Sequence, residues 1–556
     1  MESILDADLV LLDGNIICVD PAKTTAQAVA AKNGQIIAVG SDEDISSLVG
    51  RKTEVIRLAG RSVIPGFIDA HCHVEWYGRD KRGVDLMSCK NGEEALNLIK
   101  RRVEQSKPGE WVIIGGGERL ALGIIEYFSR EKVDPFSPKN PVYWNMVHRL
   151  FMNGAALEAC NITKDSQPDG VRGGTIETDA NGEFTGWFGA SKTADPPGWA
   201  LRHAKQIMYP PKDYAKLLEE GIEDWLKVGI TTAHSAWEDP YTLRAFQTLE
   251  DSGRLRMRSF ITLAMDEYSD AFIKTGMHTG FGSDMLKLQS FKVMLGMLGY
   301  PGHEAALFED YASMPGNRGY FMYPPEWVKE KVLQAVKNDW SVHTHVCGDR
   351  DMNMILTAYE KALKWYKEET GKDNTGIRLS VAHCYLFGPG DLERAVDLKL
   401  VVNVNPITKL MPYFQVGGQR EKAVGYERWR GLIPVKTMVD AGLTLSIGCD
   451  YPLGPIDPMA GLYGAISGGV HPWEAVTPYQ ALQMYTINGA YLLFSEGKIG
   501  SIEEGKLADL VVLSGNPLTM PKENIWDVSN SKPKDLVVDY TVLGGNVVYS
   551  RKEGTM

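Results

Sequence analysis

The sequence predicts an α/β protein built around a (β/α)8 TIM barrel. Eight apolar segments with strand character recur along the middle of the chain, and helical segments such as Pro325–Lys337 and Met352–Tyr366 separate most of them. Strands that alternate with helices form a parallel sheet, and eight such units close into a barrel. The predicted barrel strands are Gly66–His73, Gly229–Ser235, Met257–Ala264, Leu288–Leu295, Ser341–Cys347, Leu379–Tyr385, Leu400–Asn405 and Leu443–Asp450.

Both ends of the chain have short strands and turns instead. The N-terminal candidates are Asp8–Leu12, Asn15–Val19, Ala28–Ala31 and Gln35–Val39, with Asp13-Gly14 and Asn33-Gly34 as hairpin turn signals between them. The C-terminal candidates are Asp509–Leu513, Val537–Leu543 and Asn546–Tyr549. We therefore expect residues 1–64 and 491–556 to form one composite β-sandwich around a barrel of residues 65–490. Because residues 74–228 are more than one helix and two loops require, they should contain an inserted subdomain after barrel strand 1.

The composition favours a protein that acts on small molecules. The chain has 59 Lys and Arg against 71 Asp and Glu, a net charge of −12, and no basic cluster, which argues against nucleic acid as a partner. We see neither a signal peptide nor an apolar run long enough to cross a membrane. Seven cysteines without a CxxC motif suggest reduced thiols in the cytoplasm. A homodimer is the expected oligomer, since closed two-fold assemblies are the commonest.

The first predicted barrel strand ends in two histidines one residue apart, His71 and His73. Residues i and i+2 of a strand point to the same face, so both imidazoles aim at one point, as a divalent metal site needs. A single HxH is common, and two unrelated histidines remain the alternative.

Polar side chains also stand at the ends of other predicted strands. Lys292 lies on strand 4, His343 and His345 on strand 5, His383 on strand 6 and Asp450 on strand 8. Barrel enzymes keep their chemistry at this end of the strands. A buried lysine is costly unless its charge is removed or paired, and a carbamate formed with CO2 would remove it. A surface Lys292 and a turn-forming Asp450 are the alternatives for these two residues.

The pattern resembles the amidohydrolase superfamily over nearly the whole chain, and within it the family 3 branch of N-substituted formamide deformylase-like enzymes. Four segments carry the resemblance: Pro65–His73, Gly229–Ala236, His345–Arg350, and Tyr485–Ala490 followed by Gly500–Leu513. The resemblance implies that His71 and His73 hold one metal and His345 and His383 another. It also implies a carboxylated Lys292 as a bridge and Asp450 beside the metal and the attacking water. His343 competes with His345, but the Gly-Asp pair that follows favours His345.

Substrate contacts are predicted from the insertion and from the mouth loops. His148 resembles a branch motif that reaches the active site, and Trp76, Tyr77 and Asn405 follow barrel strands. Aromatic mouth loops suggest a neutral, partly aromatic substrate, although simple packing against the insertion explains them equally well. Arg119, Arg149 and Arg350 are candidates for binding a carboxylate, with a structural role as the alternative.

The chain departs from the branch at three places near the mouth. Met294-Leu295-Gly296 follows Lys292 where Asp-Gly is usual, Asn405 precedes Pro406 where Gln is expected, and Cys449 replaces Ser. These departures make transfer of any family substrate unsafe.

We therefore expect a metal-dependent hydrolase of a C–N bond in an amide, formamide or related compound, with catalytic Asp450 and Lys292. One or two divalent ions, best Zn²⁺, would activate hydroxide. A heteroaromatic amine deaminase, a metal-dependent decarboxylase and a non-catalytic scaffold are the alternatives, in that order.

Overall fold

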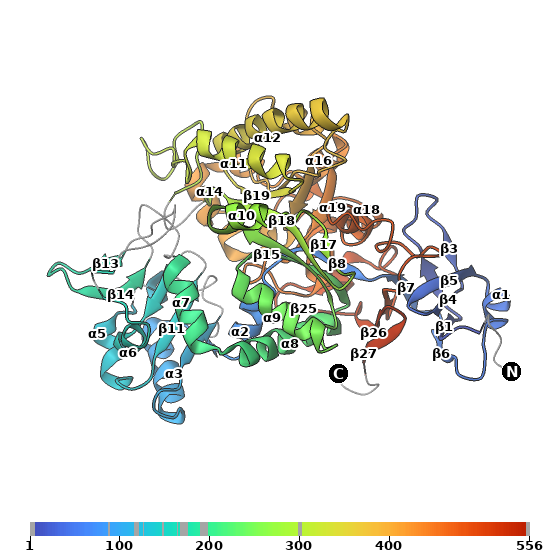
Figure 1. Cartoon of the computed structure of the whole chain (residues 1–556), viewed down its shortest axis with the longest axis horizontal. Coiled ribbons are helices and arrows are strands. Elements are labelled where there is room, and N and C mark those ends of the chain that lie inside the picture. Colours follow the sequence, from blue (N-terminus) through green and yellow to red (C-terminus); the bar gives the residue numbers. More distant parts are fainter. Residues whose placement is uncertain are drawn as a thin grey trace.

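The computed structural model describes residues 6–86, 89–115, 122–125, 127–146, 149–163, 165–166, 176–188, 198–298 and 303–551. At its centre lies the predicted barrel of eight parallel strands (Figure 1). In barrel order they are β8 (Phe67–Cys72), β15 (Ile230–Glu238), β16 (Arg258–Ala264), β18 (Leu286–Met294), β19 (Val342–Val346), β20 (Ser380–His383), β21 (Val401–Val404) and β22 (Thr444–Ile447). All eight predicted strands are confirmed, with ends that shift by up to three residues.

The last strand returns to the first at the carboxyl end of the barrel. The Asp450 backbone N–H donates to the His71 carbonyl (2.9 Å), and Cys449 N–H donates to the Asp69 carboxylate (3.1 Å). Gly448 permits this approach, because a Cβ there would lie 2.5 Å from the His71 carbonyl oxygen. The closure therefore brings Asp450 beside the histidines of β8.

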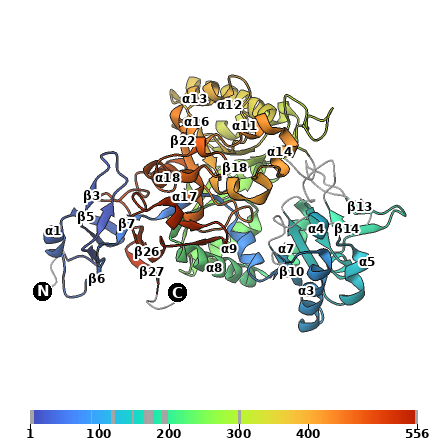
Figure 2. The same ribbon diagram turned by 180° about the vertical axis from the view of Figure 1, so that it is seen from behind.

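Helices cover the outside of the barrel (Figures 1 and 2). Those that connect or follow the strands are α8 (Pro211–Lys227), α9 (Pro240–Asp251), α10 (Met265–Lys274), α11 (Pro325–Lys337), α12 (Asp349–Thr370), α13 (Asp391–Asp397), α14 (Gln419–Val424), α15 (Tyr426–Trp429), α16 (Val435–Asp440), α17 (Pro458–Ser467), α18 (Pro478–Met484) and α19 (Ile487–Leu492). Short 3-10 turns η3 (Pro406–Leu410), η4 (Pro412–Phe414) and η5 (Pro472–Glu474) lie among them. Both helices predicted by range, α11 and α12, are present.

The two ends of the chain fold together, as Figure 1 shows by the blue and red strands side by side. One sheet has the order β5-β4-β1-β6, and the other has the order β27-β26-β23-β7-β2-β3. Their bounds are β1 (Leu9–Leu12), β2 (Asn15–Ile17), β3 (Thr25–Ala26), β4 (Ala28–Lys32), β5 (Gln35–Gly40), β6 (Glu54–Arg57), β7 (Ser62–Pro65), β23 (Leu510–Leu513), β26 (Val538–Leu543) and β27 (Asn546–Ser550). Leu9 and Leu11 of the first sheet share a buried core with Leu510 and Val512 of the second. This arrangement is the expected composite sandwich; the exact domain boundaries stay a prediction.

One of the two predicted hairpins in this region is wrong. Asn33-Gly34 joins the antiparallel strands β4 and β5, with both residues at positive φ. Asp13-Gly14 instead carries the chain from one sheet to the other, because β1 pairs with β4 and β6 whereas β2 pairs with β3 and β7. The dipeptide favours a tight turn, but the partners of the flanking strands are set by packing between the sheets.

The segment between the first two barrel strands contains a separate sheet, shown in cyan and green beside the barrel in Figure 1. Its order is β13-β14-β12-β11-β10-β9, and it has its own apolar core with α3. The elements are β9 (Val84–Asp85), β10 (Val112–Gly115), β11 (Val142–Met146), β12 (Arg149–Met152), β13 (Ile176–Thr178), β14 (Phe184–Phe188), α3 (Gly92–Gln105), α4 (Leu122–Ile125), α5 (Arg130–Val133), α6 (Gly154–Ala159) and α7 (Gly198–Met208). Helix α2 (Val74–Asp80) enters the insertion and packs against α8, which leads back to β15.

Within the described part of the chain, none of the helices has the length and apolar character needed to cross a bilayer.

Candidate metal centre

Three side chains converge where β8 and β22 end. The Nε2 atoms of His71 and His73 each lie 3.5 Å from Oδ1 of Asp450. One ligand atom from each of the three residues lies within 4.8 Å of the other two, and all three side chains are buried. Two imidazole nitrogens and a carboxylate oxygen are the donor set that zinc and related divalent ions bind.

Lys292 of β18 reaches the same point. Its Nζ lies 3.3 Å from Nε2 and 3.4 Å from Nδ1 of His71, and the residue is only 3% exposed. Burial lowers the pKa of the Lys292 ammonium to about 7, against the opposing influence of Asp450. The predicted burial of this lysine on a barrel strand is therefore confirmed, and its alternative as a surface lysine is excluded.

His345 of β19 and His383 of β20 face the cavity from the other side. Their ring centroids are 4.2 Å apart, and the His383 ring lies 5.0 Å from that of His71. His383 has a φ of +74° and Asp450 a φ of +51°. Such backbone strain in non-glycine residues clusters at functional sites, where it aims side chains that a regular strand could not aim.

Hydrogen bonds from neighbouring side chains fix the orientation of the histidine rings. His343 places Nε2 2.9 Å from Nδ1 of His71 and its own Nδ1 2.8 Å from the Ser380 hydroxyl. The Asn405 Oδ1 lies 2.7 Å from Nδ1 of His383, while the Asn405 amide donates to the Gly448 carbonyl (2.8 Å). Such contacts select one tautomer, which leaves the opposite nitrogen available to a metal. His343 is a buried barrel histidine that also positions His71.

The electrostatic environment keeps the imidazoles of His71 and His383 neutral and Asp450 ionised. Burial and the charge of Lys292 hold the pKa of His71 well below its usual range, and burial lowers that of His383 to about 4. Burial opposes ionisation of Asp450, but His383 and His73 outweigh it and lower the pKa of this carboxyl. Neutral imidazoles and a carboxylate are the protonation states that bind metals.

The six predicted ligands line one cavity, together with Trp76, whose ring stacks on His73 at 4.0 Å. The other lining residues are Trp237, Met294, Met297, Tyr451, Pro452 and Leu453. Trp237 was missed because the second barrel strand runs three residues beyond its predicted end at Ser235. An aromatic residue directly after that strand was the available signal.

Two of the predicted substrate contacts lie elsewhere. The Tyr77 hydroxyl donates to Asp224 of α8 (3.1 Å), so Tyr77 packs behind the cavity. Consecutive residues of a helix point about 100° apart, and since α2 begins at Val74, Trp76 faces the cavity whereas Tyr77 does not. Asn405 contacts His383 rather than open space, so we reassign it as a positioning residue.

The remaining candidates for substrate binding are three arginines and His148. The Arg149 guanidinium donates to Glu177 (2.8 Å), and Arg350 stacks over Phe321. His148 and Arg119 lie outside the described residues.

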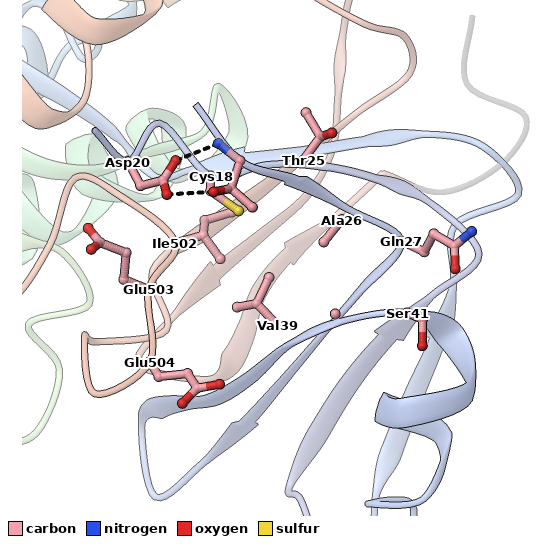
Figure 3. Close-up of a pocket in the computed structure, with 12 residues that line it drawn as sticks. Cys18, Asp20, Thr25, Ala26, Gln27, Val39, Ser41, Ile502, Glu503 and Glu504 are labelled. Carbon is pink, nitrogen blue, oxygen red and sulfur yellow. Dashed lines mark hydrogen bonds between the residues drawn. The ribbon is translucent and has the colours of Figure 1, made fainter. Parts of the chain in front are cut away.

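A second, open pocket lies between the chain ends (Figure 3), lined by Cys18, Asp20, Glu503 and Glu504 among others. Two of its three carboxylates are already engaged: Asp20 accepts from the backbone and hydroxyl of Thr24, and Glu503 accepts from Ser501 and pairs with Lys506 (2.9 Å). We therefore place the candidate site in the barrel.

The chain is similar to known proteins over almost its whole length. The chain is 27% identical to the protein LONG AFTER FAR-RED 3 of Arabidopsis thaliana, over 98% of this chain and 92% of that protein. It is also 27% identical to the N-substituted formamide deformylase of Arthrobacter pascens, over 98% of each chain.

Among solved structures, an uncharacterized metal-dependent hydrolase from Pyrococcus horikoshii superposes with a TM-score of 0.74. The match has 22% identity and covers 92% of this chain and 99% of that one, which shows a shared fold. The model of the amidohydrolase family matches residues 54–549, which include the whole barrel and the sandwich strands from β6 onward. The predicted family resemblance is thereby confirmed: the chain belongs to the amidohydrolase family.

Proposed function

We propose that this chain is a metal-dependent hydrolase that cleaves the C–N bond of an amide, formamide or related small molecule. The observation that carries the proposal is the convergence of His71, His73 and Asp450 with the buried Lys292 at one end of the barrel. A scaffold that had lost catalysis would have no reason to keep a buried, unfavourable lysine among neutral histidines.

The donor set fits one or two divalent ions, of which zinc is the best match. His71, His73 and Asp450 would hold one ion, and His345 and His383 would hold the second. A lysine whose pKa lies near 7 is a neutral amine about half the time at pH 7, whereas an ordinary lysine is almost entirely protonated. Only the neutral amine adds to CO2, so Lys292 is suited to become the carbamate that bridges two ions.

A bound divalent ion lowers the pKa of coordinated water towards 7 and so supplies the nucleophile at neutral pH. Asp450 is ionised and accepts a proton from the attacking water while the water oxygen bonds to the carbonyl carbon of the substrate. When the C–N bond breaks, Asp450 returns that proton to the leaving nitrogen. Asn405 and His343 hold His383 and His71 in place during these steps.

The lining supports a partly aromatic substrate. Trp76, Trp237 and Met294 add apolar surface to the lining beside the polar cluster. An apolar wall with a few convergent polar groups is the usual composition of a small-molecule site. We further propose that the protein is a cytoplasmic homodimer that acts on small molecules. The acidic composition supports the proposal that nucleic acid is not a partner. Light scattering after size-exclusion chromatography tests the dimer.

The test is metal content per chain by inductively coupled plasma mass spectrometry, with wild type and Lys292→Ala, beside turnover of an amide and formamide panel. About two zinc equivalents that fall to one or fewer in the variant, with activity lost, support the bridged hydrolase. One equivalent unaffected by the substitution demotes Lys292 to a mononuclear neighbour. Ammonia released from an amino-azine, with no amide cleaved, would replace the proposal by the deaminase alternative.

A further inference from the structure

A second buried cation lies near the metal centre and has no acidic partner in the described part of the chain. Arg420 of α14 is 8% exposed, and its Nε is enclosed without a hydrogen-bond partner. No described carboxylate lies within ion-pair distance of it. Buried charges in proteins are usually paired, because desolvation of an unpaired ion strongly disfavours the folded state.

The contacts that the Arg420 guanidinium makes are with the rings of two tyrosines. The guanidinium carbon lies 5.3 Å from the ring centre of Tyr413 and 5.8 Å from that of Tyr385. Cation–π contacts stabilise the charge but use none of the N–H donors. Because Nε of Arg420 has no hydrogen-bond partner among the described residues, the planar guanidinium can still donate to a carboxylate, and its fork geometry suits two parallel hydrogen bonds.

Arg420 lies one side-chain layer from the metal ligands. The Tyr385 ring is 6.4 Å from that of His383, and Sγ of Cys347 lies 3.4 Å from Nε2 of His345. Burial raises the pKa of both the Tyr385 hydroxyl and the Cys347 thiol. The charge of Arg420 lowers the pKa of each group, and the charge of Asp450 raises it. Arg420 and the metal ligands therefore act on the same intervening side chains, at the same end of the barrel.

We propose that Arg420 binds a carboxylate of the substrate, so that the substrate is an amide that bears an acid near its scissile bond. This inference rests on the proposed function and narrows it. Arg420 is not one of the arginines that the sequence alone suggests as carboxylate ligands, and one of those, Arg149, is already paired with Glu177.

The test compares N-formyl-phenylalanine with N-formyl-2-phenylethylamine, which is the same molecule without the carboxylate, on the zinc-loaded full chain. Wild type should prefer the acid by about 100-fold in kcat/KM, since two charge-assisted hydrogen bonds are at stake. Arg420→Met should abolish that preference and change turnover of the neutral compound less than about threefold. Arg420→Lys should fall between them. The matched control is Arg430→Met, an exposed arginine that packs on Tyr426 and Trp473.

A merely structural role for Arg420 predicts a different set of results. Removal of a structural arginine lowers the melting temperature and reduces turnover of both compounds together, and either result would overturn the proposal. We expect the ligand-free melting temperature of Arg420→Met to stay level or rise, because an unpaired buried charge is lost.

Binding separates this inference from the proposed function. If neither compound is hydrolysed, isothermal titration of the same pair still measures recognition. Arg420-dependent binding of the acid without cleavage would contradict the hydrolase and support the carboxylate site. Equal or absent binding of both compounds to wild type would overturn the carboxylate site.

Discussion

Replacement of Lys409 by Met should stabilise the protein. Lys409 lies in η3, directly after barrel strand β21, and is 1% exposed. Its Nζ has no hydrogen-bond partner among the described residues. The nearby Glu474 carboxylate is already satisfied by the backbone and hydroxyl of Thr437 (3.0 and 2.8 Å). Methionine keeps the apolar stem of the side chain and removes the ammonium.

The size of the effect follows from the pKa of Lys409. Burial lowers it from 10.5 to about 7, with Glu474 in opposition. At pH 7 the unfolded chain carries the proton and the folded chain carries it only half the time, so the folded state loses about 4 kcal/mol. This loss is complete below pH 7, decreases as the pH rises, and disappears above the unfolded pKa of about 10.5.

The assay is the melting temperature of wild type and Lys409→Met between pH 6.5 and 9.5. For a barrel of this size we expect a gain of about 4–6 °C at pH 7 that shrinks to about 1–2 °C at pH 9.5. Lys364→Met, on the exposed face of α12, serves as the matched control and should show no such dependence on pH. A variant that is less stable than wild type at pH 7, or a gain that grows with pH, would refute the reasoning.

Four further outcomes are expected. Asn405→Ala should weaken zinc binding about 10- to 100-fold in a chelator competition, because Nδ1 of His383 loses its acceptor, and Asn405→Asp should restore most of the affinity. Asp509→Ala should lower the free energy of unfolding by about 3–5 kcal/mol, because it leaves the buried Arg258 guanidinium unpaired. The double replacement Arg258→Met with Asp509→Leu should recover most of that loss in urea unfolding. A loss equal to the sum of the losses in Arg258→Met alone and Asp509→Leu alone would contradict the pairing. Tyr77→Phe should leave kcat/KM within about twofold; a larger loss would return Tyr77 to the substrate site.

The barrel was predictable from the sequence because its strands are short apolar runs bounded by polar residues and separated by helical periodicity. The same pattern located the six candidate ligands, since polar side chains at the ends of parallel strands must meet at one edge. Their convergence in the structure depends only on strand order and direction, and sequence patterns report both well.

Two features were not predictable in this way: which side chain of a helix faces the cavity, and which residues far apart in the sequence are in contact. Tyr77 and Trp76 are adjacent in sequence, and the start of α2 alone decides which one faces the cavity. Lys409 and Arg420 belong to segments of mixed polarity, so nothing local indicates that tertiary packing encloses them. The partner of His343 comes from a strand about 270 residues away, a contact that no spacing rule reports.

The position of β7 has a consequence for biosynthesis. This strand directly precedes the metal-binding strand β8, yet in the finished sheet it lies between β2 and β23. About 450 residues separate β7 from β23, and at 5–20 residues per second the ribosome needs about 20–90 s to supply that partner. Until then one edge of β7 stays open beside the most metal-reactive part of the chain. A chaperone would protect the nascent protein at this stage, and premature termination before β23 should yield aggregated rather than inactive soluble protein.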